Sequence, residues 1–123
     1  MRIERPSPDR RRRNGDDIFL GSVDSQPIIG NEARDLRLIE HTFRSGARNK
    51  LHTHTTDQIL IVTAGEGIVG TEHEERDIAA GDVVHIPAGE RHWHGAKPGS
   101  DMTHLAVLGN GKTFIVADDR PAD

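Results

Sequence analysis

The chain has 123 residues, a formal net charge of −4 and no cysteine. Its length fits one domain with a single core, and the acidic balance gives no general attraction to nucleic acid or to an anionic membrane. Without cysteine there is no disulfide, thiolate metal ligand or thiol nucleophile. No apolar run approaches the length of about 18 residues that a membrane span needs, and residues 1–14 lack the apolar run of a secretory signal. We therefore expect a cytoplasmic protein.

The N-terminal residues 1–16 are polar and contain four consecutive arginines, Arg10 to Arg13. Such a run can bind phosphate groups, but a short run with acidic residues on both sides is more often simply solvated. We expect a flexible arm over 1–16, a single barrel domain over 17–117 and a flexible polar tail over 118–123.

The central part of the chain consists of short apolar or alternating segments separated by glycine-containing turns, and no segment has a helical period. We predict strands over 18–20, 36–43, 52–54, 59–63, 68–70, 83–86, 103–108 and 113–116. Turns are predicted over 64–67, 73–75, 80–82 and 87–90. Many short strands with regular turns are typical of an all-β antiparallel sandwich or small barrel.

Two histidine pairs at strand spacing stand out in this pattern. His52 and His54 are two residues apart, so in an extended strand their side chains project to the same face. Gln58 has the same parity after a short polar turn, and His92 and His94 form the second pair. Because neutral imidazole is the commonest protein ligand for metals, we predict that the fold brings the two stretches together around one metal ion.

The spacing of these residues resembles the two sequence motifs of the cupin superfamily. The first motif would be Gly46, five residues, His52-Thr53-His54, three residues, Gln58, six residues and Gly65. The second would be Gly81, five residues, Pro87-Ala88-Gly89, two residues and His92. The resemblance implies a double-stranded β-helix, also called a jelly-roll barrel, with one divalent metal ion held inside by His52, His54, Gln58 and His92.

Gln58 departs from the pattern of that family, in which the corresponding ligand is usually Glu. An amide oxygen carries no charge, so three neutral histidines and Gln58 would leave the ion with its full charge. We infer that such an ion is a stronger Lewis acid and is less readily oxidised. Mixed nitrogen and oxygen ligands suit Mn²⁺, which we favour, with Fe²⁺, Ni²⁺, Co²⁺ and Zn²⁺ as alternatives.

Several segments are similar to a narrower group, the small bacterial cupins that include manganese-dependent hydroxynitrile lyases. These segments are Gly46-Ala47-Arg48, 58–65, 92–96 and 102–105. The resemblance implies that His94 and His104 are catalytic acid–base residues. Strand parity supports the mapping, since His94 shares a face with His92, and His104 shares one with Ala106 and Leu108. The position at which those lyases carry a glutamine is Leu108 here.

The leading hypothesis is a metal-dependent lyase that acts on a small oxygenated molecule by Lewis-acid and histidine acid–base chemistry. The alternatives are an iron-dependent dioxygenase and a non-catalytic cupin that binds a metal or small ligand. A barrel with few large apolar residues buries little surface alone, so we also expect a homodimer.

Other polar and aromatic residues carry weaker expectations. His41 and His85 are candidates for lining the pocket, and His73 is expected to be solvated. Arg48 could anchor a substrate carboxylate, although a surface salt bridge is the simpler interpretation. Trp93 has the opposite parity to the histidines beside it, which predicts packing outside the barrel, in the core or at a subunit contact.

Overall fold

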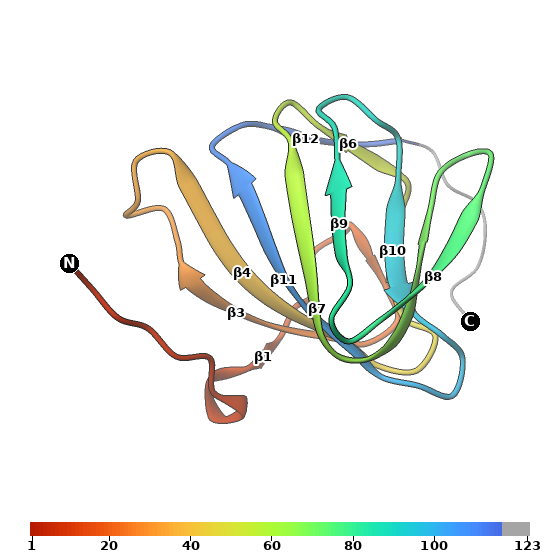
Figure 1. Cartoon of the computed structure of the whole chain (residues 1–123), viewed down its shortest axis with the longest axis horizontal. Helices are drawn as coiled ribbons and strands as arrows, with labels where there is room; N and C mark the ends of the chain where they lie inside the picture. Colours follow the sequence, from red (N-terminus) through yellow and green to blue (C-terminus); the bar gives the residue numbers. More distant parts are fainter. Residues whose placement is uncertain (117–123) are drawn as a thin grey trace.

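Antiparallel strands make up nearly all of the regular structure in a computed structural model that describes residues 1–116 (Figure 1). A short 3₁₀ turn, η1 (Pro8–Arg10), precedes them. The strands are β1 (Arg12–Arg13), β2 (Phe19–Leu20), β3 (Val23–Ile29), β4 (Leu36–Phe43), β5 (Arg48–Asn49), β6 (His52–His54), β7 (Gln58–Gly70), β8 (Glu75–Ala79), β9 (Val83–Ile86), β10 (Trp93–Ala96), β11 (Met102–Gly109) and β12 (Thr113–Ile115). The all-β fold predicted from the sequence is confirmed.

The long strand β7 connects two sheets that curl around the interior. Its first part pairs with β9 and β11, and β11 continues through β4 and β3 to β1. Its second part pairs with β8 and β10, and β10 continues through β5 to β2. A separate pair, β6 and β12, carries the first two histidines.

The turn predicted over residues 64–67 is wrong, because these residues continue β7. Gly65 has a φ of +77°, and a Cβ atom there would collide with the backbone carbonyl of Asp101. Glycine therefore allows the strand to bend sharply from one sheet into the other while it passes close to the start of β11. In this chain the glycine signal marks a corner of the barrel and not a reversal.

Strand register places three rows of residues on the interior face of the first sheet. Opposite residues in antiparallel strands point to the same face, and the rows run from β4 through β11 to β7. They consist of Arg37, Leu108 and Gln58, then Ile39, Ala106 and Leu60, then His41, His104 and Val62. His104, Ala106 and Leu108 are all buried, as the parity argument predicted.

Apolar side chains fill the rest of the interior in two clusters. One contains Val23, Phe43, Ala47, Val62, Ile78, Ala96 and Met102, and the other contains Leu60, Ile86, Ala106 and Leu108. Phe43, at the centre of the first cluster, also contacts the rings of His94 and His104, with centroid distances of 5.7 and 5.3 Å. The apolar core therefore supports the histidines directly.

The strand β3 was not predicted, because its sequence is largely polar and contains Pro27. Its Gln26 is buried and donates a hydrogen bond of 2.8 Å to Glu40. Arg11 forms an ion pair of 2.7 Å with the same carboxylate. The N-terminal segment that we expected to be a flexible arm thus contacts the first sheet, and Arg12 and Arg13 pair with Ser25 and Asp24.

The predicted tail, 118–123, lies outside the described residues. No helix within residues 1–116 is long and apolar enough to cross a bilayer.

Candidate metal centre

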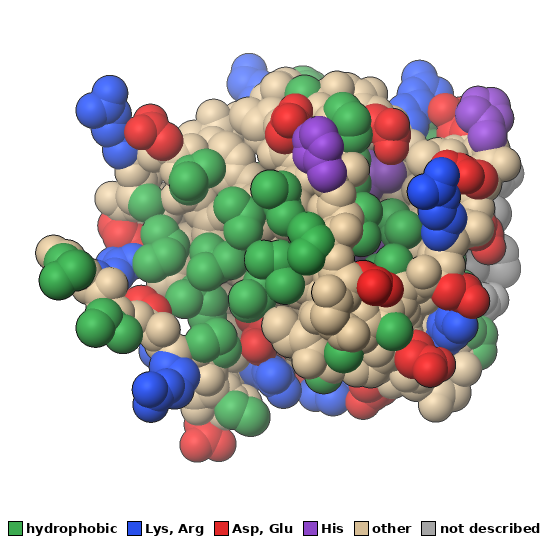
Figure 2. All heavy atoms as spheres, in the orientation of Figure 1, with side chains coloured by type: hydrophobic (Ala, Val, Ile, Leu, Met, Phe, Trp, Pro, Cys, Tyr) green, Lys and Arg blue, Asp and Glu red, His purple; other side chains and the backbone are tan. Residues whose placement is uncertain are grey.

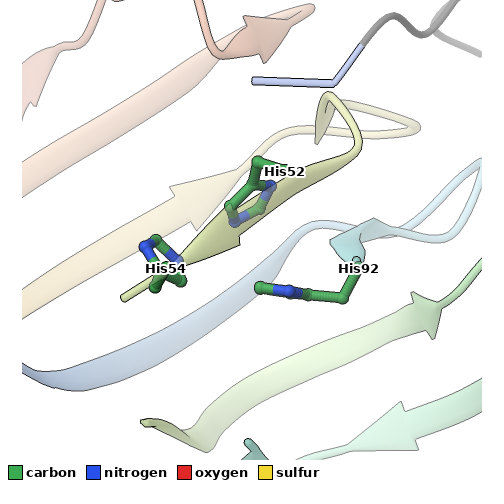
Figure 3. A group of neighbouring side chains, drawn as sticks. All are labelled: His52, His54 and His92. Carbon is green, nitrogen blue, oxygen red and sulfur yellow. The ribbon is translucent and has the colours of Figure 1, made fainter. Parts of the chain in front are cut away.

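Three buried histidines from distant parts of the sequence lie together inside the barrel (Figure 3). His52 and His54 come from β6, and His92 lies just before β10. One ring nitrogen from each lies within 4.8 Å of the others. Backbone hydrogen bonds of 2.9 and 3.0 Å between His52 and His92 hold the two segments side by side. The structure therefore brings together the two stretches that the sequence predicted to meet, in a group that could hold a metal ion.

Backbone hydrogen bonds set the tautomers of two of these histidines. His52 Nδ1 lies 2.6 Å from the carbonyl oxygen of Lys50, and His92 Nδ1 lies 2.9 Å from that of Glu90. A carbonyl oxygen only accepts hydrogen bonds, so each Nδ1 must carry the proton and donate it. The lone pair of each ring is then on Nε2, where a metal ion can use it.

In His54, too, only one of the two ring nitrogens has a hydrogen-bond partner among the described residues. Its Nδ1 lies 2.8 Å from the Thr113 hydroxyl on β12, while its buried Nε2 has no hydrogen-bond partner in the described part of the chain. Burial is the main cause that lowers the pKa of His52 to about 3 and that of His54 to about 4. Both rings are therefore neutral near pH 7, which is the form that binds metals.

Gln58 lies beside the three histidines at the start of β7. Its Oε1 is 3.2 Å from His92 Nε2, and its side chain is buried. Gln58 thus adjoins the histidine group, and its role as the fourth ligand stays a prediction. The histidine group includes no Asp, Glu or Cys among the described residues, so these ligands would not offset the charge of a bound divalent ion.

A second pair of buried histidines adjoins this group and is linked by hydrogen bonds. The Oδ1 of Asn49 accepts the backbone N–H of His94 at 2.8 Å, so its Nδ2 is the atom that faces His94 Nε2, at 3.1 Å. Because the amide nitrogen donates, His94 carries its proton on Nδ1 and donates it to His104 Nε2, at 3.0 Å. The remaining nitrogen, His104 Nδ1, is buried without a hydrogen-bond partner in residues 1–116.

Burial keeps both of these rings neutral. Together with the nearby His41, it lowers the pKa of His104 to about 3, and it lowers the pKa of His94 well below its usual range. However, only one of the two residues lines the cavity. His94 lines a cavity of about 350 Å³ together with His52, His54 and Gln58, whereas His104 is not part of this lining and is fully buried.

Two other predicted pocket histidines have different positions. His41 lines the same cavity, with its Nδ1 2.6 Å from the Ser25 hydroxyl. His85 is exposed on β9 and pairs with Asp57 at 2.9 Å, so it does not line this cavity. Asn49 was not singled out from the sequence, because an isolated amide in a two-residue strand carries no pattern that indicates a role.

Arg48 and Trp93 pack against each other away from the cavity. Both side chains are buried, and the Arg48 guanidinium lies 4.8 Å from the centre of the Trp93 ring. Arg48 is therefore buried, whereas the sequence suggested a salt bridge at the surface. Trp93 lies outside the metal pocket, as its parity indicated.

The fold and this histidine group are those of a cupin. Residues 39–108 match the family model described as "Cupin domain", so the chain belongs to that family. It is also similar to a cupin-like protein from Thermotoga maritima, with a TM-score of 0.84 and 30% identity over 90% of this chain and 88% of the other. The predicted cupin barrel is confirmed.

Relatives of known activity are enzymes of several kinds. The chain is 41% identical over 111 residues to the (R)-mandelonitrile lyase of Granulicella tundricola, covering 87% of this chain and 83% of the lyase. It is 27% identical over 84 residues to the acireductone dioxygenase of Parasynechococcus marenigrum, covering 62% of this chain and 45% of the dioxygenase. These similarities support an enzymatic cupin.

Proposed function

We propose that this cupin is a mononuclear divalent-metal enzyme that cleaves or forms a small oxygenated molecule by chemistry of the hydroxynitrile lyase type. One observation carries the proposal. The cavity that is lined by His52, His54 and Gln58 is also lined by His94, which is hydrogen-bonded to a second buried neutral histidine. A site for an ion and a proton acceptor therefore face the same small space. The similarity to a mandelonitrile lyase supports this choice of reaction.

His52, His54, Gln58 and His92 would hold the ion, for which we favour Mn²⁺. When bound, the ion would act as a Lewis acid that stabilises negative charge on a substrate oxygen. The neutral ligand set favours this role, because none of the four protein groups offsets the charge of the ion.

His94 is proposed to move the proton. In cyanohydrin cleavage the substrate hydroxyl loses its proton to His94 Nε2, which must first release the hydrogen bond that it accepts from Asn49 Nδ2. The bond to the nitrile carbon breaks, and its electron pair leaves with cyanide. The hydroxyl carbon becomes a carbonyl carbon, and cyanide takes up the proton that the histidine pair accepted from the hydroxyl, which returns both histidines to their neutral forms. A depressed pKa suits this role, because it keeps His94 unprotonated and able to accept.

His104 is proposed to position His94 and to share the transferred proton. As Nε2 of His94 gains a proton, Nδ1 can pass its own proton to His104 across the hydrogen bond of 3.0 Å. This shift keeps His94 neutral and places the charge on His104. His104 acts through His94 and not on the substrate, because it does not line the cavity.

A kinetic test uses manganese-loaded protein and mandelonitrile, with release of benzaldehyde followed by absorbance. His94→Gln should lower kcat by about a hundredfold or more, in line with the usual contribution of a general base, while metal content stays unchanged. His73→Gln is the matched control, because His73 is exposed on the turn between β7 and β8. Full activity of His94→Gln would refute the proton-transfer role.

The dioxygenase alternative is supported only by the more distant relative. It predicts oxygen uptake by protein that has been loaded with iron under anaerobic conditions. A non-catalytic cupin would instead bind metal without turning over any substrate. The cleavage assay and an oxygen electrode separate these functions from the proposed lyase.

We also propose that the chain pairs with a second copy through the outer face of the first sheet. Figure 2 shows apolar side chains gathered over β4, β11 and β7 on this face. Register places six of them as neighbours, in an outer patch that consists of Leu38, Ile59, Ile61, Val83, Leu105 and Val107. Val83 is 66% exposed and Ile59 39%. A contiguous apolar patch suits a self-complementary contact.

A further inference from the structure

One cationic side chain, Arg37 on β4, shares the interior face with the metal centre. Arg37 lies opposite Leu108 on β11, and Leu108 lies opposite Gln58 on β7. The Cα atoms of Arg37 and Gln58 are therefore two strand spacings apart, or about 10 Å. Arg37 also lines the cavity that is lined by His54 and Gln58. A guanidinium and the candidate metal centre thus border the same space.

The guanidinium of Arg37 has no partner within the described residues. It makes no hydrogen bond or ion pair there, and its Nε atom is buried. Other arginines of this region are paired, for example Arg11 with Glu40 and Arg44 with Asp24. A buried donor without a partner is costly, so a site that keeps one is expected to supply the partner from outside the chain.

The surroundings of Arg37 favour an anion as that partner. Arg37 lies on the same interior face as Gln58 and lines the cavity together with His54, so its positive charge borders the space next to the metal centre. Asp16 is the only carboxylate among the described residues that line the cavity, and it does not pair with Arg37. Between Arg37 and Gln58 the lining is the apolar side chain of Leu108, which suits a carbon skeleton.

We propose that Arg37 binds the carboxylate of the substrate, so that the natural substrate is a small 2-hydroxy or 2-oxo acid. This inference rests on the proposed function, because it takes the other end of the cavity as the place of the reacting oxygen. A guanidinium binds a carboxylate through two parallel hydrogen bonds. In such an acid the carboxylate would contact Arg37, and the adjacent hydroxyl or carbonyl group would face the histidines.

Calorimetric titration of manganese-loaded protein with mandelate and with the neutral mandelamide tests the proposal. The two probes differ only in the group that Arg37 would bind. The wild type should bind mandelate more tightly than mandelamide. Arg37→Gln should weaken mandelate binding by about tenfold or more and leave mandelamide binding nearly unchanged, whereas Arg37→Lys should keep part of the preference for the acid.

Arg34→Gln is the matched control, because Arg34 precedes the same strand and its side chain is 93% exposed. It should leave the binding of both probes unchanged, and thermal unfolding should show that each variant is folded. Equal losses for both probes in Arg37→Gln, or no preference for the acid in the wild type, would overturn the proposal.

The test of acid binding by Arg37 and the test of the proposed lyase reaction can fail independently of each other. If mandelonitrile is not cleaved but the preference for mandelate depends on Arg37, the proposed lyase reaction fails while the acid site stands. Metal content, measured on the same samples, should be equal in the wild type and in Arg37→Gln. A loss of metal in Arg37→Gln would mean that Arg37 supports the metal centre and would overturn its role as an acid-binding residue.

Discussion

Acid should destabilise the metal-free protein, and His104 should account for a defined part of that effect. His104 is fully buried, and burial lowers its pKa from 6.5 to about 3. Between these two values the unfolded chain binds a proton that the folded chain excludes. The free energy of unfolding therefore falls as the pH falls below 6.5, and the loss continues until the pH approaches the folded-state pKa.

The size of the effect follows from the two pKa values. Between pH 7 and pH 5, a histidine that titrates near 6.5 when unfolded and near 3 when folded removes about 2 kcal/mol from the free energy of unfolding. His104→Gln removes the titrating group, and its amide oxygen can still accept the Nδ1–H of His94. The difference in unfolding free energy between pH 7 and pH 5 should therefore be smaller in His104→Gln by about 2 kcal/mol.

Urea denaturation of EDTA-treated protein at the two pH values, followed by circular dichroism, measures this difference. His73→Gln removes an exposed histidine and should leave the pH dependence of the wild type in place. If His104→Gln and the wild type lose the same free energy between pH 7 and pH 5, His104 is not a buried neutral base. The derived tautomers of His94 and His104 would then also be wrong.

Three further changes test other parts of the structure. Gln58→Glu adds a negative charge at the centre and should retain metal while slowing mandelonitrile cleavage; equal rates would contradict the charge argument. Gly95→Ala should lower the free energy of unfolding by about 2 kcal/mol, because its Cβ would collide with Arg48 and the Ala47 carbonyl. Gly15→Ala is the control, because a Cβ atom at Gly15 meets no other atom within 4 Å; an equal loss of thermal stability in the two variants would contradict this packing. Val83→Glu places a charge in the outer patch and should convert a dimer to a monomer in light scattering; a monomeric wild type would refute the dimer.

The metal-site histidines could be predicted because their arrangement depends on local geometry. His52 and His54 point to one face by strand alternation alone, and the motif spacing supplied His92. The position of Asn49 could not be predicted in this way. Its contacts to His94 join residues 45 positions apart, and only the pairing of β5 with β10 brings them together.

Two errors in the predicted strands have physical causes. β3 was missed because its buried Gln26 is satisfied by hydrogen bonds to Glu40 and to the backbone of Ser7, so the strand lacks an apolar alternation. The residues around Gly65 have the glycine pattern of a turn, but glycine permits both a reversal and a bend. The choice between them depends on partner strands, which a local pattern does not contain.

Metal content is the most direct test of the central hypothesis, that His52, His54, Gln58 and His92 hold one divalent ion. Protein loaded with Mn²⁺ and then desalted would be measured by elemental analysis, alongside His92→Ala and the control His85→Ala, whose histidine lies outside the cavity. We expect about one ion per chain in the wild type and the control, and a value well below one in His92→Ala. Equal metal content in His92→Ala and the wild type, or no bound metal in the wild type, would contradict the site.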